Sequence, residues 1–277
     1  RLLLYRLGVH TGFAHIIGIS LATDVAFMAT PAGVGGYAAS VYYLRRAGAS
    51  VSGAAAVTAA DQALDVAFFA LALPLAGFAL FGAHLPQTWA VVAFGSGALL
   101  LALALAAVLA RRRLSAWLFE PDGVGSFWPW WARHRQSVRG FCANLLDQAR
   151  TLAASGPTFL AIVFALTALQ WLARYGVLWL ALVLLGHPVS FALTLLLQAV
   201  VLNAAQWTGV PAGGGGAEIG LSATLAAWVP QTDIATALLL WRMATLYASL
   251  LVGLVAIGWL ARRRDTQAAT LALPIED

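Results

Sequence analysis

The sequence predicts an all-α integral membrane protein: a polytopic helical bundle with two oppositely oriented re-entrant Pro-Gly hairpins that form an inverted repeat. Composition is the first observation, because 61% of the 277 residues are hydrophobic and only 10% are charged. Soluble domains carry about 25% charged residues, so this chain belongs in a lipid bilayer. Its long Leu-, Ala- and Val-rich runs lack the alternation of membrane strands and favour helices.

The second observation is a short phrase that occurs twice. Pro31-Ala-Gly-Val-Gly-Gly36 returns in the second half of the chain as Pro211-Ala-Gly-Gly-Gly-Gly216. Each copy interrupts an apolar stretch at membrane depth, where open backbone is tolerated only inside protein or beside a polar cavity. Paired breaks in corresponding positions of two halves point to a transport site between inverted repeats.

The first half, residues 1–110, is predicted to begin with a re-entrant hairpin at 12–44. An apolar limb enters the membrane, meets the first Pro-Gly break, and a short limb returns to Arg45 and Arg46. We expect one further helix ahead of Arg1 in the full-length protein, because the order of hairpins and spans would then be more regular.

Two spans complete the first half, over 52–80 and 88–110. Ser50 or Ser52 is placed to cap the first span, since a serine hydroxyl accepts a hydrogen bond from a free N–H at a helix start. The second span stops at the cluster Arg111–Arg113.

Residues 111–156 are predicted to be a cytoplasmic interfacial linker. Tryptophans suit the headgroup level of a membrane, and four lie here: Trp117, Trp128, Trp130 and Trp131. Apolar residues recur at helical spacing from Gln136 to Leu152, which predicts an amphipathic helix in the membrane surface. A cytoplasmic helix packed on the bundle is the alternative.

The second half, residues 157–264, is predicted to repeat the plan in inverted form. A span over 157–185 leads to a second re-entrant hairpin at 189–228, and a last span over 234–260 follows. The remaining residues, 265–277, are predicted to be a disordered tail.

Arginine clusters fix the expected sidedness, because cytoplasmic loops carry an excess of positive charge. These clusters are Arg45–Arg46, Arg111–Arg113, Arg133–Arg150 and Arg262–Arg264. With all of them in the cytoplasm, the first hairpin enters from the cytoplasm and the second from outside. The prediction is therefore a multi-pass protein of the bacterial inner membrane with an inverted-topology repeat.

Six formally charged residues lie inside the predicted membrane segments: Asp24, Asp61, Asp65, Arg174, Glu218 and Arg242. A charge at the centre of a membrane helix costs about 2.5–3.5 kcal/mol on insertion scales, so each needs a partner or a function. The repeat offset places Arg242 opposite Gln62, and we hypothesise that the two helices approach each other. The charges then form either ion pairs that hold the bundle or a polar pathway for phosphate and for an ammonium or proton.

The glycine clusters are a second candidate binding element. Short helices begin after Gly33, Gly35 and Gly36 and after Gly213, Gly214, Gly215 and Gly216, and free N–H groups at helix starts attract anions. Close helix packing is the alternative reason for both clusters. Glu218 lies in the first turn of the second short helix and is placed to satisfy that end itself. Asn203 adds an intramembrane polar group, for which interhelical hydrogen bonding is the alternative.

Several functions are not expected. No nucleophile elbow, nucleotide motif or metal-ligand spacing is found, so we expect no catalytic residue, no enzyme activity, no metal and no cofactor. The single Cys142 leaves no internal disulfide. Nucleic acid is not an expected partner, because the arginines flank apolar spans.

These motifs resemble a known family. Three segments are similar to the lysylphosphatidylglycerol synthase transmembrane region, or flippase-like domain family. They are Thr30-Pro-Ala-Gly-Val-Gly-Gly-Tyr37, the helix segment Asp61-Gln-Ala-Leu-Asp65, and Val210-Pro-Ala-Gly-Gly-Gly-Gly-Ala-Glu218 ahead of a span with Arg242. That family includes the membrane half of the multiple peptide resistance factor and YbhN-type proteins. The chain departs from the pattern at Tyr37-Ala-Ala39 and at Asp61-Gln62.

The resemblance implies a membrane lipid flippase that moves a phospholipid, such as an aminoacylated phosphatidylglycerol, between leaflets through a central polar cavity. Aminoacyl transfer belongs to a soluble enzyme or domain, which becomes an expected partner beside membrane lipids. Two alternatives are a membrane subunit that presents lipid to a synthase or glycosyltransferase, and a secondary transporter of a small solute. The oligomeric state is open, and a homodimer is compatible with the sequence.

Overall fold

The computed structural model describes residues 1–82, 129–206 and 208–271, and these residues form helices and no strand. The predicted span 88–110 and the cluster Arg111–Arg113 lie outside the described residues. The all-helical class predicted from composition is confirmed for the part of the chain that the structure describes.

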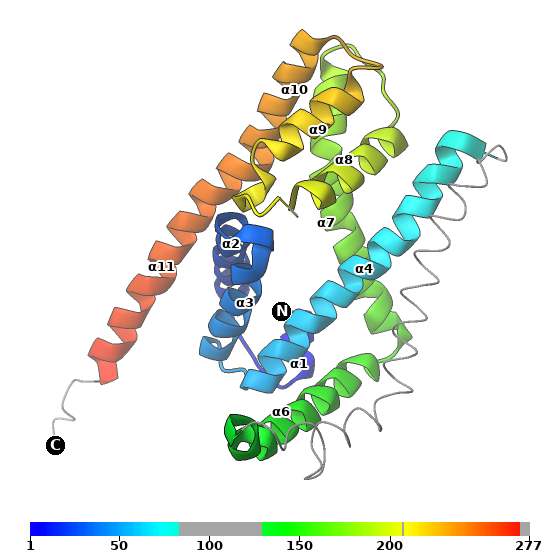
Figure 1. Ribbon diagram of the computed structural model, residues 1–277. Helices are drawn as coiled ribbons and strands as arrows, with labels where there is room; N and C mark the ends of the chain where they lie inside the picture. The colour runs from blue at the N-terminus through cyan, green and yellow to red at the C-terminus, as the bar shows by residue number, and fades with distance from the viewer. Residues whose placement is uncertain (83–128, 207, 272–277) are drawn as a thin grey trace, which may run out of the picture.

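Three of the described helices are long and apolar enough to cross a membrane. They are α4 (Val51–Phe81), α7 (Pro157–Leu184) and a rod, Gln231–Arg262, shown in Figure 1. The predicted cap of α4 is confirmed, because the Ser50 hydroxyl accepts a hydrogen bond of 3.0 Å from the Gly53 N–H. The chain is therefore a membrane protein with at least three candidate spans.

The rod consists of three consecutive pieces. It begins as α10 (Gln231–Arg242), continues through a π-helical turn, Met243–Tyr247, and ends as α11 (Ala248–Leu271). Helix α11 thus extends past Arg264 into the segment that the sequence analysis expects to be disordered. Wide turns of this kind are rare and occur frequently at functional sites.

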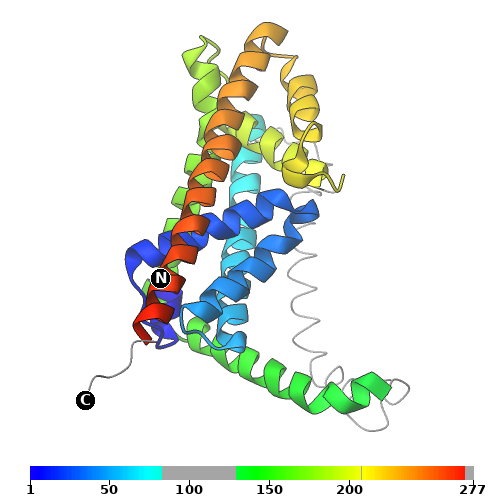
Figure 2. The same cartoon turned by 90° about the vertical axis from the view of Figure 1, so that its left-hand side faces the viewer.

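Two shorter helix pairs occupy the regions of the predicted hairpins. The first pair is α2 (Phe13–Ala29) and α3 (Val34–Arg46), and the second is α8 (Phe191–Gln206) and α9 (Gly216–Leu225). Figure 2 shows that the two tips meet near the middle of the molecule, and the two connecting turns contact each other. The first pair reaches this point from the end where α6 lies, and the second from the opposite end.

The two connecting turns share one unusual backbone conformation. Both are Pro-Ala-Gly 3-10 turns, with φ and ψ of 51° and 17° at Ala32 and of 54° and 16° at Ala212. The next residues, Gly33 and Gly213, have φ of 70° and 62°. A positive φ at a residue other than glycine is uncommon, so the repeated sequence phrase encodes a repeated local structure.

Helix α6 (Pro129–Ala153) lies across the lower end of the bundle in Figure 1 and packs against α4 and the short α1 (Leu2–Arg6). Its last apolar residue in the predicted amphipathic pattern, Leu152, is buried. Phe141 and Leu146 remain exposed on the same helix. The amphipathic helix is present, and one part of its apolar side packs on the bundle.

Two apolar cores support the helix pairs. One joins α7, α8, α9 and α10 around Leu178, Leu221 and Ile234, and the other joins α2, α3 and α4 to α11 around Ile19 and Leu44. The first pair packs on α4 and α11, and the second pair packs on α4, α7 and α10. The contact between the turns lies between these two cores.

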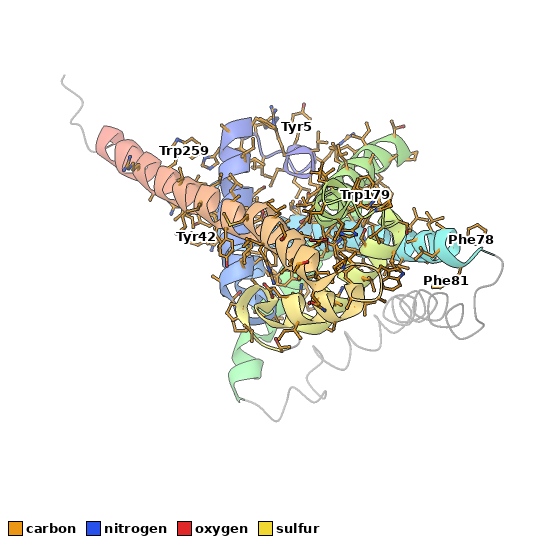
Figure 3. All side chains as sticks on the ribbon, turned by 90° about the horizontal axis from the view of Figure 1, so that it is seen from above. Tyr5, Tyr42, Phe78, Phe81, Trp179 and Trp259 are labelled. Atoms are coloured by element: carbon orange, nitrogen blue, oxygen red, sulfur yellow. The ribbon has the colours of Figure 1, made fainter. Side chains whose placement is uncertain are left out.

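The outer surface of the long helices is apolar. Phe78 and Phe81 project from the outer end of α4, whereas Trp259 on α11 packs against Gly18 of α2 (Figure 3). Phe78 is 62% exposed and Val255 is 73% exposed. A continuous exposed apolar surface is unfavourable in water and is expected where helices face lipid.

Candidate functional site

A polar cavity of about 360 Å³ lies where the two helix pairs meet α4, α7 and the rod. Five of the six predicted intramembrane charges line it: Asp24, Asp61, Asp65, Arg174 and Arg242. These residues come from α2, α4, α7 and α10, so four separate helices contribute charge to one space. The sixth charge, Glu218, lies behind the lining and contacts the cavity through Arg242.

Arg242 and Glu218 form an ion pair on the side of the second helix pair. The Arg242 Nε donates to Glu218 Oε1 at 2.5 Å, and Nη1 donates to the Ala212 carbonyl oxygen at 3.4 Å. The guanidinium also lies 4.6 Å from the centre of the Trp241 ring. Arg242 is only 7% exposed, and burial of an arginine at this level requires such compensation.

This pairing differs from the hypothesis drawn from the repeat offset. The described residues contain no ion pair between Arg242 and either Asp61 or Asp65. Helix α9 packs directly on α10, so Glu218 reaches Arg242 first, within the same half of the chain. The acids of α4 and the base of α10 instead line different sides of the same cavity.

The opposite side of the cavity, formed by α2, α4 and α7, carries ionisable side chains that form no ion pair among the described residues. Asp24, Asp61 and Asp65 are close enough to interact electrostatically, and Arg174 attracts both Asp24 and Asp65. Among the described residues, however, none of these three carboxylates forms an ion pair with Arg174. Around the cavity, with Glu218 included, four carboxyl groups accompany two guanidinium groups.

Neutral hydrogen bonds hold Asp65 in place. The Trp171 Nε1–H donates to Asp65 Oδ1 at 2.6 Å, and the Gln62 Nε2 lies 3.4 Å from Oδ2. The Tyr37 hydroxyl in turn donates to Gln62 Oε1 at 3.0 Å. This chain of contacts links α3, α4 and α7, and all four side chains line the cavity.

Trp171, Gln62 and Tyr37 are not among the site residues predicted from the sequence. One signal was available for Trp171, which lies three residues before Arg174 and therefore on the same helix face. It also lies in the middle of a span, whereas membrane tryptophans are enriched at the interfaces. No comparable pattern marks Tyr37, because its contact depends on how α3 packs against α4.

The predicted glycines divide into two groups. Gly33 and Gly213 line the cavity as parts of the two turns, whereas Gly35, Gly36 and Gly214–Gly216 do not. A Cβ atom at Gly36 would lie 2.1 Å from the Phe27 ring, and one at Gly35 would lie 2.4 Å from Thr30. Close helix packing therefore accounts for the second and third glycines of the first cluster.

Amide side chains complete the lining. Asn203 lines the cavity while its Nδ2 donates to the Ala199 carbonyl oxygen at 2.7 Å. Gln198 is almost fully buried and donates to the Tyr175 carbonyl oxygen at 2.9 Å, which joins α8 to α7. Across the described ranges, no group of His, Cys, Asp and Glu is arranged to hold a metal ion.

Comparisons with known proteins agree with the fold and extend over the whole site. A family model described as lysylphosphatidylglycerol synthase TM region matches residues 1–253. A UPF0104 membrane protein of Archaeoglobus fulgidus is 21% identical over 268 residues, which cover 94% of this chain and 80% of that protein. No solved structure matches the chain. The family match includes both Pro-Ala-Gly turns and every charged residue of the cavity.

Proposed function

This chain belongs to the lysylphosphatidylglycerol synthase TM region family, and on that premise we propose that it moves a polar lipid between the two leaflets of a membrane. The observation that carries the proposal is the charged cavity between helices whose outer surfaces are apolar. Its volume of about 360 Å³ lies in the range of about 300–1,000 Å³ typical of ligand sites. A headgroup could cross there while its acyl chains stay in the bilayer.

The proposal includes two re-entrant hairpins of opposite orientation. Helix α2 has 17 residues and α8 has 16, which at 1.5 Å per residue is about 25 Å and short of the bilayer core of about 30 Å. Both helices end at the central cavity and reach it from opposite ends of the bundle. These lengths and directions support an inverted repeat, with the arginine-bearing end in the cytoplasm of a bacterial inner membrane.

The charges suggest how a headgroup would bind. Asp24, Asp61 and Asp65 would attract an ammonium group, and Arg174 would contact the phosphodiester. Arg242 is paired with Glu218 and would act mainly by holding the second Pro-Ala-Gly turn in place. An aminoacylated phosphatidylglycerol carries both kinds of charge and is the proposed substrate class. Modification of the lipid is assigned to a separate soluble enzyme or domain, and this chain to transport alone.

Leaflet exchange in proteoliposomes tests the proposal. The purified protein would be reconstituted with labelled phosphatidylglycerol, its lysyl derivative and a glycolipid. The variant with Asp61→Asn and Arg174→Gln removes one charge of each sign from the cavity. The matched control is Asp147→Asn, which removes an exposed carboxylate on α6, far from the cavity lining.

Exchange by the wild type and the control, with loss in the cavity variant, would support a lipid translocator and rank its headgroups. Absence of exchange of every lipid by folded protein would contradict the proposal. In that case, a subunit that presents lipid to a partner enzyme would become the better explanation.

A further inference from the structure

One side chain contacts two opposite charges of the cavity at once. Trp171 donates its indole N–H to Asp65 on α4 at 2.6 Å. The guanidinium carbon of Arg174, one helical turn further along α7, lies 5.8 Å from the centre of the same indole ring. Trp171 therefore lies between the carboxylate and the guanidinium in the network of contacts.

The two charges would be expected to meet without this arrangement. Arg174 has a long flexible side chain, and its charge acts on Asp65 and on Asp24. Opposite charges attract each other more strongly at a protein site than in bulk water. Yet in the described residues Arg174 forms no ion pair with either carboxylate.

Trp171 can hold both groups without cancelling either charge. Its N–H is a neutral donor, so the hydrogen bond orients Asp65 and leaves the negative charge in place. Its ring face attracts the guanidinium through a cation–π contact. The ring itself is fixed by edge contacts, at 4.8 Å to Phe69 and 5.7 Å to Tyr175.

We infer that Trp171 is a positioning residue that keeps Asp65 and Arg174 apart, so that the cavity presents a separate negative and positive charge to one headgroup. The ligand class rests on the proposed function: a headgroup with an ammonium for Asp65 and a phosphate for Arg174. A phenylalanine at this position keeps an aromatic ring and lacks the N–H donor. In Trp171→Phe, Asp65 loses its hydrogen bond and is expected to form an ion pair with Arg174. Neither charge is then available to the ligand.

The experiment measures binding of two soluble headgroup probes to the purified chain in uncharged detergent, by calorimetry. Glycerophosphoethanolamine carries phosphate and ammonium, and glycerophosphoglycerol carries phosphate alone. The proteins are the wild type, Trp171→Phe, Asp65→Asn and the double variant. Loss of charged hydrogen bonds predicts that Trp171→Phe weakens binding of both probes by about tenfold or more.

Rescue distinguishes a positioning role from a packing role. In the double variant, Arg174 has no charged partner at position 65, so glycerophosphoglycerol binding should return to within about threefold of the wild type. Binding of glycerophosphoethanolamine should stay weak, because its ammonium site is gone. No rescue of glycerophosphoglycerol, or losses that simply add in the double variant, would overturn the inference.

Trp179→Phe is the matched control. Trp179 lies on the same helix, and its indole N–H donates to the Val189 carbonyl oxygen at 3.0 Å, outside the cavity lining. The control should bind both probes as the wild type does. Equal weakening by Trp179→Phe would attribute the loss to packing of α7 and overturn the positioning role.

The binding assay tests the role of Trp171 and the exchange assay tests lipid transport, so either proposal can be contradicted without the other. The predicted rescue without lipid exchange would support the role of Trp171 and contradict the transport proposal. Lipid exchange without rescue would support the transport proposal and contradict the role of Trp171. A folded wild type that binds neither probe would overturn the inference, because its two charges would then not be available to a headgroup.

Discussion

The two halves of the molecule hold the same Pro-Ala-Gly turn by different means. In the first half, Gly35 and Gly36 pack so closely on Thr30 and Phe27 that a Cβ atom would collide. In the second half, Gly214 and Gly216 have room, since the nearest atom to a Cβ at either position would be 3.5 Å away. There, Arg242 holds the turn through the Ala212 carbonyl group and Glu218.

Because the two turns are held differently, the charged residues of the two halves have different roles. The second half uses its ion pair as a structural anchor. Packing anchors the turn of the first half, so Asp24 and Asp61 remain outside ion pairs within the described residues. Unpaired charges in a membrane protein are costly, and their presence points to a role in binding.

The largest expected effect comes from Glu218→Ala, which breaks the anchor of the second half. Arg242 would be left buried without its charged partner, which costs about 3 kcal/mol. For a chain of this size, that corresponds to a fall in Tm of about 6–12 °C in detergent. Thermal unfolding measured by circular dichroism checks it.

Glu218→Gln is the control, because the amide oxygen still accepts a hydrogen bond from Arg242. Its fall in Tm should be clearly smaller than that of Glu218→Ala. Equal stability of wild type and Glu218→Ala would show that the pair is not an anchor, and the contrast between the halves would no longer hold.

The next effect compares equivalent glycines of the repeat. Gly36→Ala should lower the free energy of unfolding by about 1–3 kcal/mol, because the new methyl group overlaps the Phe27 ring. Gly216→Ala, at the corresponding position of the second half, should be neutral or stabilising, since the new methyl group has room there and alanine restricts the unfolded chain. Chemical unfolding of the two variants side by side measures the difference, and equal losses would contradict it.

A smaller effect is expected for a more exposed hydrogen-bonded pair, His187 and Asp233. His187 Nε2 lies 2.7 Å from Asp233 Oδ2, and this pair joins the turn after α7 to the first turn of α10. Exposed pairs contribute at most about 1 kcal/mol, so Asp233→Asn should shift Tm far less than Glu218→Ala. A fall in Tm as large as that of Glu218→Ala would mean that burial does not explain the difference in stability between the two pairs.

The smallest effect on stability is expected for Asp24→Asn in the first half. Asp24 has no ion-pair partner among the described residues, so removal of its charge should change the free energy of unfolding by less than about 1 kcal/mol. Exchange of a cationic lipid should nevertheless fall. Joint measurement of Tm and exchange checks this, and a large drop in Tm with unchanged exchange would assign Asp24 a structural role.

Sequence reasoning located the charges of the site better than their partners. Asp24, Asp61, Asp65, Arg174 and Arg242 were selected because each is costly in an apolar segment, and all five line one cavity. Hydropathy and position along the chain are both local, and they are enough to find such charges. The twin Pro-Ala-Gly turns were likewise visible as a repeated phrase.

The partners depend on packing between helices, which no local pattern contains. The repeat offset placed Arg242 opposite Gln62, whereas α9 brings Glu218 against Arg242 within its own half. The partner of Trp171 could not be predicted for the same reason, since its hydrogen bond crosses from α7 to α4. A pairing between residues that lie far apart in sequence requires the crossing positions of the helices.

The π-helical turn at Met243–Tyr247 changes the direction in which the rod presents its side chains. A wide turn accommodates one residue more than a regular helix, and each residue rotates the helix by about 100°. Above it, Arg242 faces the cavity; below it, Gly253 meets α2 so closely that a Cβ atom would lie 2.7 Å from the Leu21 carbonyl oxygen. The extra residue in this turn lets one continuous rod pack against two different neighbours. Deletion of one residue from the turn would rotate Gly253 away from α2 and leave Arg242 facing the cavity.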